Sequence, residues 1–460
     1  MSSHIHGHTR EHTPGRTTGH TPEQTEEAAH QHGHRHVGQD MLSVEEAYKR
    51  IMASFGPLQP VEMPLLESLG HVLAVDISSP LDLPPAANSG MDGYAVRRED
   101  IVNASEGEPR KLKVIGLAAA GQVPTQTVRA ATAVRIMTGA TIPDGADTVV
   151  PFEETDEVAR KSAGDPLEEV AIMADLPFGC NVRPAGEDVR KGQLVLEKGT
   201  IIRPAEVGVM ASLGLGTISV VRSPVVAILA TGDELAETGL PLEPAKIYDS
   251  NSFSVAASVI ASGGIPKLLG IARDNIEDLR AKLEAALDSD LVVTSAGVSK
   301  GDYDIVKDVL TQRGDMNFWS VRMRPAKPLA FGHLNSPHGN PVPLLGLPGN
   351  PVSAMVAFEM FARPAIRTML GRGHLPRPTV EGVLTGSIHN ADGRRVYARV
   401  EVERRNGTYY AKPAGPQGSN ILTSMSRANG LAICPENLAI KRAGERVRII
   451  MLDWNEEVDL

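Results

Sequence analysis

Residues 223–372 alternate short apolar runs with amphipathic helical patterns, and this alternation restricts the possible folds more than any other feature of the chain. Residues 225–230 are continuously apolar, as expected of a strand that is covered on both faces. Strands that alternate with helices build a parallel sheet through right-handed crossovers. We therefore predict a doubly wound, mostly parallel α/β sheet. The expected strands are residues 225–230, 267–272, 291–295 and 344–347, and the expected helices are residues 251–262, 275–287, 304–313 and 352–370.

The polar residues of this region gather in loops that follow the expected strands. Ligands of open α/β sheets bind at the carboxyl ends of the strands, so these loops are the place to look for chemistry. Two of them, residues 295–304 and 346–353, are Gly-rich turns before helix N-termini, where free N–H groups favour a phosphate. Carboxylates beside a phosphate suit Mg²⁺. The carboxylates in these loops are Asp233, Glu234, Asp274, Asp302 and Asp304.

Each of these signals also has a purely structural explanation, because Gly-rich turns serve the backbone and an Asp at a helix start serves as a cap. Their convergence on one edge of one sheet favours a binding site. A further cue is the segment 323–328, in which Arg324 and Lys327 lie among prolines. Proline fixes φ, so this segment would present two cations to an anion at small entropic cost. A solvated basic turn is the alternative.

The remainder of the ordered chain is dominated by β patterns. Ser43 and Glu46 form a capping box that predicts a helix at residues 43–54. From residue 61 to about 182, and again after 373, short β segments broken by Gly and Pro predict a β-rich domain and a small C-terminal barrel or sandwich. Within the first, NSGMDGYAV at residues 88–96 packs small polar groups on Gly-containing turns, which is typical of a hairpin turn and also of a binding loop.

The N-terminal segment differs in kind, since residues 1–36 hold nine of the 14 histidines and almost no aliphatic side chains. Such a composition predicts a disordered tail. Because imidazole tracts bind Ni, Cu and Zn, a metal-holding tail is the alternative.

Charge and composition exclude several classes of protein. A net charge of -10 argues against a nucleic-acid partner, which would need a basic surface. No stretch approaches the roughly 20 apolar residues that span a bilayer, and the N-terminus lacks the apolar core of a secretory signal, so we expect a cytoplasmic protein and no membrane partner. Cys180 and Cys434 lie far apart without a CxxC motif, which fits a reducing compartment and no zinc site.

A series of motifs, spread in order over residues 42–460, resembles one family. The motifs are NSGMDGYAV, RIMTGA, RPAGEDV, TGDEL, IYDSNS, SAGVSKGDYD, RPAKPLAFG, GLPGNPVSA, RRVYARV and GPQGSN. The family is that of the molybdopterin molybdenumtransferases, or MoeA family, which includes the E domain of gephyrin. The His-rich tail at 1–40 has no counterpart in the family pattern. For the rest of the chain the resemblance implies a linker domain at 41–60 and 180–222, an inserted β-rich domain at 61–179, a molybdopterin-binding α/β domain at 223–372 and a C-terminal β domain at 373–460.

The resemblance also implies a homodimer whose active cleft lies between the α/β domain of one subunit and the inserted domain of the other. Asp92 and Thr138 would face the partner's pterin site. The expected catalytic residues are Asp92, Glu234, Asp274, Asp304 and Lys327, and Asp233, Glu234 and Asp304 would hold Mg²⁺. The expected residues for substrate phosphates, pterin and molybdate are Thr138, Asp188, Asp233, Ser299, Gly301, Arg324, Pro328, Gly349, Asn350, Ser353, Arg394, Arg399 and Ser419.

By this likeness the reaction inserts molybdate into adenylylated molybdopterin and releases AMP, with a molybdopterin adenylyltransferase as the upstream donor. We expect no covalent nucleophile, because no Ser-His-Asp or Cys-His arrangement is evident. Two alternatives stay open at this point. The first is a scaffold protein of the same fold, since a fold does not determine a function. The second is an enzyme that inserts tungstate, an oxyanion of the same charge and nearly the same size.

The chain departs from the family pattern at a few positions. Where the family usually reads KPGKP, Arg324 replaces the first Lys and Ala326 replaces Gly. Arg keeps the charge, whereas Ala restricts the backbone. Ala296 likewise stands where a Gly is usual, and Lys300 stands where an apolar residue is common; Lys300 is either an extra phosphate contact or, as we favour, a surface residue.

Overall fold

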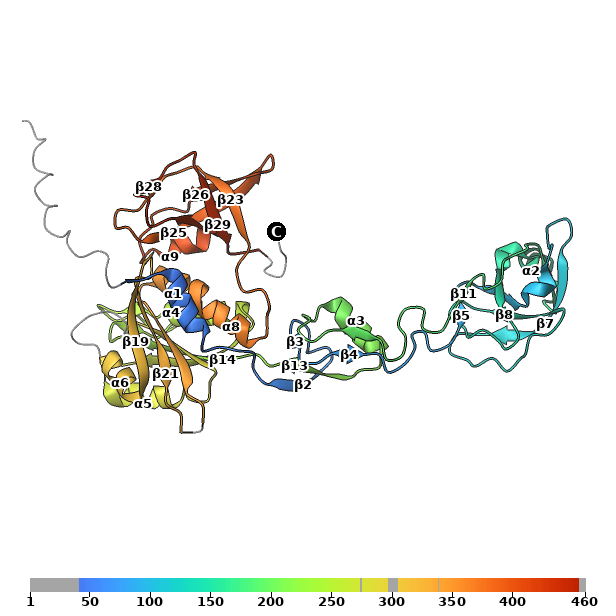
Figure 1. Ribbon diagram of the computed structural model, residues 1–460, viewed down its shortest axis with the longest axis horizontal. Coiled ribbons are helices and arrows are strands. Elements are labelled where there is room, and N and C mark those ends of the chain that lie inside the picture. Colours follow the sequence, from blue (N-terminus) through green and yellow to red (C-terminus); the bar gives the residue numbers. More distant parts are fainter. Residues whose placement is uncertain (1–40, 274, 297–304, 338, 455–460) are drawn as a thin grey trace, which may run out of the picture.

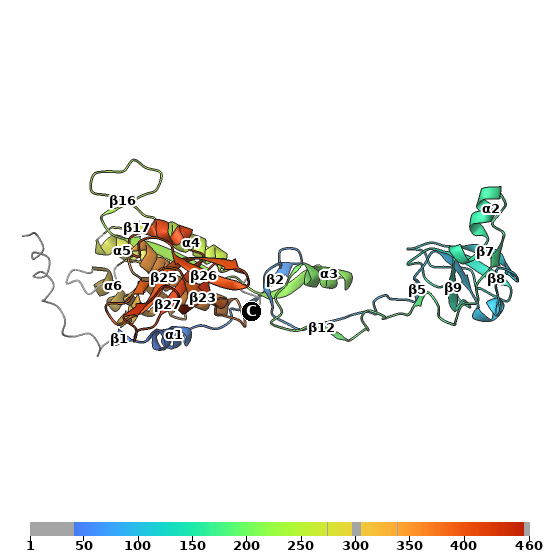
Figure 2. The same cartoon turned by 90° about the horizontal axis from the view of Figure 1, so that it is seen from above.

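The structure, a computed structural model, describes residues 41–454 except residues 274, 297–304 and 338. The chain is elongated, and both views show the same succession of parts (Figures 1 and 2). The α/β and C-terminal parts lie together at one end, a small linker part lies in the middle, and a β-rich part lies at the far end.

A seven-stranded sheet forms the centre of the α/β part, with strands in the order β1-β19-β21-β22-β18-β14-β17. The pairings among β17, β14, β18 and β22 are parallel, whereas β21 is antiparallel to both of its neighbours. The mostly parallel sheet is therefore confirmed, with three strands, β1, β19 and β21, that the sequence pattern did not predict. The bounds are β1 Met41–Leu42, β14 Val225–Thr231, β17 Ile265–Ala272, β18 Leu291–Ser295, β19 Gly314–Val321, β21 Pro328–Leu334 and β22 Val342–Leu347.

Helices cover both faces of this sheet. Val226 and Ile228 of β14 point into a core shared with the helices α1, α4, α7, η3 and α8, whereas Ala227 and Leu229 point into a second core shared with α5 and α6. The strand is apolar throughout because neither face meets water. The bounds are α1 Val44–Met52, α4 Asn251–Ala261, α5 Ile276–Glu284, α6 Ile305–Arg313, α7 Pro351–Ala357, η3 Phe358–Ala362 and α8 Arg363–Met369.

Local side-chain chemistry explains where several helices begin. The Ser43 hydroxyl accepts from the Glu46 N–H at 3.1 Å, so the predicted cap is present. Asn275 caps α5, because its side chain accepts from the Asp278 N–H at 2.8 Å. The helix expected at 352–370 contains a π-helical turn, η3, just before Pro364. Proline has no N–H to give to the carbonyl four residues earlier, which accounts for the altered hydrogen-bonding pattern there.

The linker part is built from segments that lie far apart in the sequence. Strand β13 (Thr217–Val221) pairs with β2 (Pro60–Pro64) and β3 (Val72–Leu73), and β12 (Leu194–Leu196) pairs with β4 (Ile77–Ser78). Helix α3 (Pro204–Ser212) packs on them through Met210. The segment expected as the inserted domain, 61–179, thus begins with strands that pair within the linker, a long-range pairing that local β patterns do not reveal.

The inserted part has a mixed sheet in the order β10-β7-β8-β6-β9. The chain enters and leaves this part through two adjacent segments, which are joined by an isolated antiparallel bridge between Leu83 and Val189. Helix α2 (Glu157–Ala163) lies beside the sheet, and β5 (Asn88–Ser89) pairs with β11 (Val182–Arg183) at its near side. The strand bounds are β6 Gly93–Val96, β7 Arg110–Ala118, β8 Thr132–Ile136, β9 Thr148–Pro151 and β10 Glu169–Ile172.

The C-terminal part is a closed barrel rather than a sandwich, because β25 pairs with both β26 and β27 and so completes the ring β25-β26-β23-β29-β27. The short strand β20 (Met323–Arg324) pairs with β25 and attaches the barrel to the α/β part. The bounds are β23 Thr379–Leu384, β25 Arg395–Arg405, β26 Thr408–Pro413, β27 Gly430–Cys434, β29 Arg446–Met451 and α9 Leu422–Arg427.

Candidate active site

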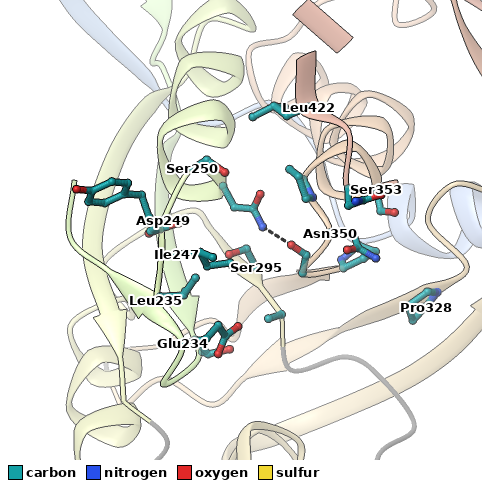
Figure 3. A pocket seen from close by; sticks show the side chains of 18 residues that line it. Glu234, Leu235, Ile247, Asp249, Ser250, Ser295, Pro328, Asn350, Ser353 and Leu422 are labelled. Atoms are coloured by element: carbon teal, nitrogen blue, oxygen red, sulfur yellow. Dashed lines mark hydrogen bonds between the residues drawn. The ribbon is translucent and has the colours of Figure 1, made fainter. Parts of the chain in front are cut away.

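A pocket of about 680 Å³ lies at the carboxyl ends of β14, β18 and β22. Its walls come from the loops after these strands, from the first residues of α4 and α7, and from Asn420 and Leu422 of the C-terminal part (Figure 3). This volume is in the range of small-molecule sites, about 300–1,000 Å³. The predicted residues Glu234, Pro328, Gly349, Asn350 and Ser353 all line it.

Two helix N-termini meet at the pocket. Asn350 is the N-cap of α7, and Pro351 occupies the first helical turn, where its missing N–H is not needed. The Asn251 amide at the start of α4 donates to the Gly349 carbonyl at 2.7 Å, which ties the two helix starts together (Figure 3). The dipoles of both helices favour negative charge at this place.

The pocket also contains carboxylates. Asp249 is 5% exposed, and its Oδ1 accepts from the Ser252 N–H at 3.0 Å, so it caps α4. Glu234 is exposed and folds back over Gly232, whose φ is +143°. Side chains rarely adopt this φ, so the turn favours glycine at position 232. Asp233 does not line the pocket; its carbonyl accepts from Lys246.

A magnesium site was expected here. Among the residues that the structure describes, no group of three or more His, Cys, Asp or Glu is arranged to hold a metal. Mg²⁺ is, however, commonly bound by one or two carboxylates together with substrate phosphates. Glu234 beside two helix N-termini fits this donor set. Asp274, Ser299, Gly301, Asp302 and Asp304, also expected in the site, lie outside the described residues.

The expected cations Arg324, Lys327 and Arg394 do not line the pocket, and Arg324 and Arg394 bind groups of the C-terminal part. Arg324 donates to the His389 carbonyl at 2.6 Å and lies 3.8 Å from Asp392, which also accepts from Arg394 at 3.0 Å. Lys327 is exposed beside the pocket-lining Pro328.

The two alanines that replace family glycines both have positive φ, +80° for Ala296 and +73° for Ala326. A side chain at such positions is strained, so the turns keep the glycine-type conformation at some energetic cost.

Arg399 is buried and holds a loop rather than lining the pocket. It is 1% exposed and donates to the Ser424 hydroxyl and to the carbonyls of Pro416, Gln417 and Gly418, at 3.0–3.1 Å. Burial lowers its pKa to about 10. The loop that it holds continues into Ser419, whose carbonyl accepts from the Val352 N–H at 3.1 Å, and into Asn420 of the pocket wall.

The expected residues of the inserted part lie at the opposite end of the same chain (Figure 1). The Thr138 N–H and hydroxyl donate to Asp92 Oδ1 at 2.6 and 2.7 Å, and these bonds lower the pKa of Asp92. Gly93 is required next to this pair, because a Cβ there would lie 2.0 Å from the Val150 carbonyl oxygen. Asp188 is exposed near the narrow connection. One chain therefore does not bring Asp92, Thr138 and Asp188 to its own pocket.

Sequence reasoning missed Tyr248, Asp249, Asn251 and Asn420 as pocket residues. Tyr248 and Asp249 belong to the segment between β14 and α4, and Asn251 is the first residue of α4, so the rule that strand-to-helix connections carry the site would have found them. Asn420 comes from the C-terminal part, and nothing local in the sequence places it at this edge.

The fold and the pocket define a multidomain α/β protein with a site suited to a phosphate-bearing small molecule. Sequence profiles of three regions match the chain: the MoeA N-terminal region (domain I and II) at 42–214, the probable molybdopterin binding domain at 227–368 and the MoeA C-terminal region (domain IV) at 381–452. The chain belongs to the MoeA family and is a molybdopterin molybdenumtransferase, a transferase of molybdenum cofactor biosynthesis.

Individual relatives agree with this assignment. Molybdopterin molybdenumtransferase 2 of Mycobacterium tuberculosis is 38% identical over 416 residues, covering 89% of this chain and 99% of that protein. The enzyme of Haemophilus influenzae is 34% identical over 414 residues, with 89% and 98% covered. The molybdopterin biosynthesis MoeA protein of Pyrococcus horikoshii has a TM-score of 0.77 at 30% identity, with 90% of this chain and 100% of that one covered. Within the described residues, no helix is long and apolar enough to cross a membrane.

Proposed function

We propose that this protein inserts molybdate into adenylylated molybdopterin and releases AMP, and that it does so as a homodimer in the cytoplasm. The upstream donor would be a molybdopterin adenylyltransferase. The observation that carries the proposal is the pocket itself, in which the starts of α4 and α7 meet an exposed carboxylate, Glu234, beside the Lys327 segment. Such a site can receive a pyrophosphate and an oxyanion together.

The substrate's phosphates are placed against the start of α7. Gly349 keeps the approach to the backbone open, and Asn350 and Ser353 offer an amide and a hydroxyl as hydrogen-bonding partners. Ser299 and Gly301, by family likeness, would complete this cradle. Because the helix N-terminus is fixed before the substrate arrives, it can stabilise a departing phosphate without reorganisation.

Molybdate is a dianion and must approach a second anion, so positive charge is required. Lys327 is exposed next to the pocket-lining Pro328, Arg324 three residues earlier donates to the His389 carbonyl, and Arg394 donates to the Met323 carbonyl. Arg399 and Ser419 would contribute by holding the loop that ends at Asn420. Mg²⁺, when bound by Glu234 and, by family likeness, by Asp233 and Asp304, would neutralise phosphate charge.

The homodimer is supported by the distance between the two halves of the expected site. Asp92 and Thr138 belong to the inserted part, next to β6 and β8, whereas the pocket is lined by the α/β and C-terminal parts. These parts lie at opposite ends of the elongated chain (Figure 1), so a second copy would be needed to unite them. The edge strand β17 and the neighbouring α4 also expose several large apolar side chains, which suits burial against another subunit. These are Phe253, Ile260, Ile265 and Leu268.

The test is molybdate-dependent release of AMP from adenylylated molybdopterin by the purified protein, measured by chromatography. Release above the level without protein supports the proposal, and Lys327→Ala should reduce it. A protein that binds the substrate but releases no AMP would be a scaffold, and the proposal would be wrong. Competition between tungstate and molybdate in the same assay identifies the preferred oxyanion.

A further inference from the structure

The inserted part contains a polar network of Tyr94, Glu157 and Arg135, in which the first two side chains are buried and Arg135 is partly buried. The Tyr94 hydroxyl donates to Glu157 Oε2 at 2.6 Å. Arg135 binds the same carboxylate with two bonds, Nε to Oε2 at 2.9 Å and Nη2 to Oε1 at 2.7 Å. Lys161 of α2 is a further partner of Glu157. Glu157 is 1% exposed and Tyr94 is fully buried.

The charges in this network are fixed. Burial opposes ionisation of Glu157, but the hydrogen bonds from Arg135, Lys161 and Tyr94 outweigh burial and lower its pKa to about 2. A two-bonded guanidinium on an ionised carboxylate has little rotational freedom. Arg135 is therefore a cation held in one orientation.

Arg135 lies close to the turn that holds Asp92. Strands β6 and β8 are antiparallel with Tyr94 opposite Arg135, and side chains two residues apart share one face of a sheet. Asp92 lies two residues before Tyr94 and Met137 two residues after Arg135, so both follow the same paired end of the two strands. Arg135 Nη1 lies 3.7 Å from Met137 Sδ. The next residue, Thr138, is the one that holds Asp92.

Backbone bonds couple the same turn to the Asp92 loop. The Gly139 N–H donates to the Ser89 carbonyl at 2.8 Å, and the Ser89 N–H donates to the Ala140 carbonyl at 2.9 Å. Ser89 is fully buried, and its hydroxyl donates to the Met91 carbonyl. A shift of the turn at residues 137–140 would therefore move Asp92 with it.

We propose that Tyr94, Arg135 and Glu157 are positioning residues, which hold the 137–140 turn so that Asp92 is presented in one orientation to the pocket of the partner chain. This inference rests on the proposed function. A network that only stabilises the fold would affect the melting temperature, whereas a positioning network acts on turnover through Asp92.

The experiment is a double-mutant cycle in the AMP-release assay, with Arg135→Gln made in the wild-type chain and in the Asp92→Asn chain. We expect Arg135→Gln to lower kcat about ten-fold at unchanged KM for molybdate, and to add no further loss once Asp92 is replaced. Arg135→Lys should recover part of the loss. Glu206→Gln is the matched control, since Glu206 is 6% exposed and paired with Arg203 in the linker. It should lower the melting temperature and leave kcat unchanged.

Losses that add fully in the two backgrounds would overturn this inference and leave the proposed function standing. Wild-type turnover in Asp92→Asn would remove Asp92 from the proposed site and would overturn this inference as well. If Arg135→Gln does not fold, Tyr94→Phe replaces it in the cycle, because this change removes a single hydroxyl from a buried ring. A smaller loss that again vanishes beside Asp92→Asn is expected, and a loss that persists would refute the role.

Discussion

Two variants that each damage one side of the site can test whether the site is shared between chains. Asp92→Asn alters the inserted part and Glu234→Gln alters the pocket. Both side chains are exposed, so neither change should disturb folding. In a homodimer with shared sites, each variant alone has two damaged sites. A mixed dimer has one site with both changes and one site with neither.

The expected recovery follows from counting. Random association of equal amounts gives about half mixed dimers, and one of the two sites in each is intact, so the mixture should reach about a quarter of wild-type AMP release. The variants carry different affinity tags and are co-expressed. Purification over both tags isolates the mixed dimer, whose activity should rise to about half of wild type by the same reasoning.

The control pairs two changes on the same side, Glu234→Gln with Asn350→Ala. Both residues line the same pocket, so every site in that mixed dimer is damaged and no recovery is expected. Mixed dimers of the first pair that are no more active than the separate variants would refute the shared site.

Three further predictions concern stability. The pKa of Glu157 is lowered from 4.5 to about 2, so the stability that ionised Glu157 contributes is present above pH 4.5 and is lost as the pH falls toward 2. Glu157→Gln should remove up to about 3 kcal/mol of the pH-dependent free energy of unfolding, measured by acid unfolding with circular dichroism. Ala296→Gly should raise the free energy of unfolding, measured by denaturant titration, by up to about 1 kcal/mol, because Ala296 has a φ of +80°; a lower free energy of unfolding would contradict the strain argument. Gly93→Ala should cost about 2–3 kcal/mol in the same measurement, whereas Gly208→Ala, with nothing within 4 Å of the added carbon, should stabilise α3 by about 0.5–1 kcal/mol.

Much of the α/β core could be predicted because its signals are local. The strand at residues 291–295 was expected and is observed as Leu291–Ser295, because a short apolar run is typical of a strand that is covered on both faces. The Ser43 cap follows from side-chain chemistry within one helical turn. Such features depend on neighbours in the sequence, which the chain itself supplies.

Strands β19 and β21 could not be predicted in the same way. Their sequences, GDMNFWSV and PLAFGHL, mix polar, Gly and aromatic residues and show neither a continuous apolar run nor regular alternation. They are strands because they pair with each other, with the Trp319 and Phe331 rings 6.0 Å apart across the pair. Non-local pairing of this kind is energetically decisive but leaves no local pattern.

Part of the candidate site could likewise be predicted from the local sequence, and part of it could not. Glu234, Gly349 and Asn350 follow from the rule that ligands meet the carboxyl ends of strands, and all three line the pocket. The role of Arg399 could not be read from its motif, because a cation expected to face an oxyanion is buried against loop carbonyls. Burial is set by the barrel that surrounds it, which is a property of the whole fold.

The bridge between Leu83 and Val189 brings the two ends of the inserted part together, so this part can be replaced as one unit. Its two ends lie about one strand spacing apart, roughly 5 Å, and it has apolar cores of its own. Relatives could therefore exchange the inserted part by recombination at these two neighbouring positions, without a change in the α/β and C-terminal parts that form the pocket. The two halves of the proposed shared site can therefore diversify separately. Loop changes would alter the pocket, and replacement of the whole inserted part would alter the half that contains Asp92.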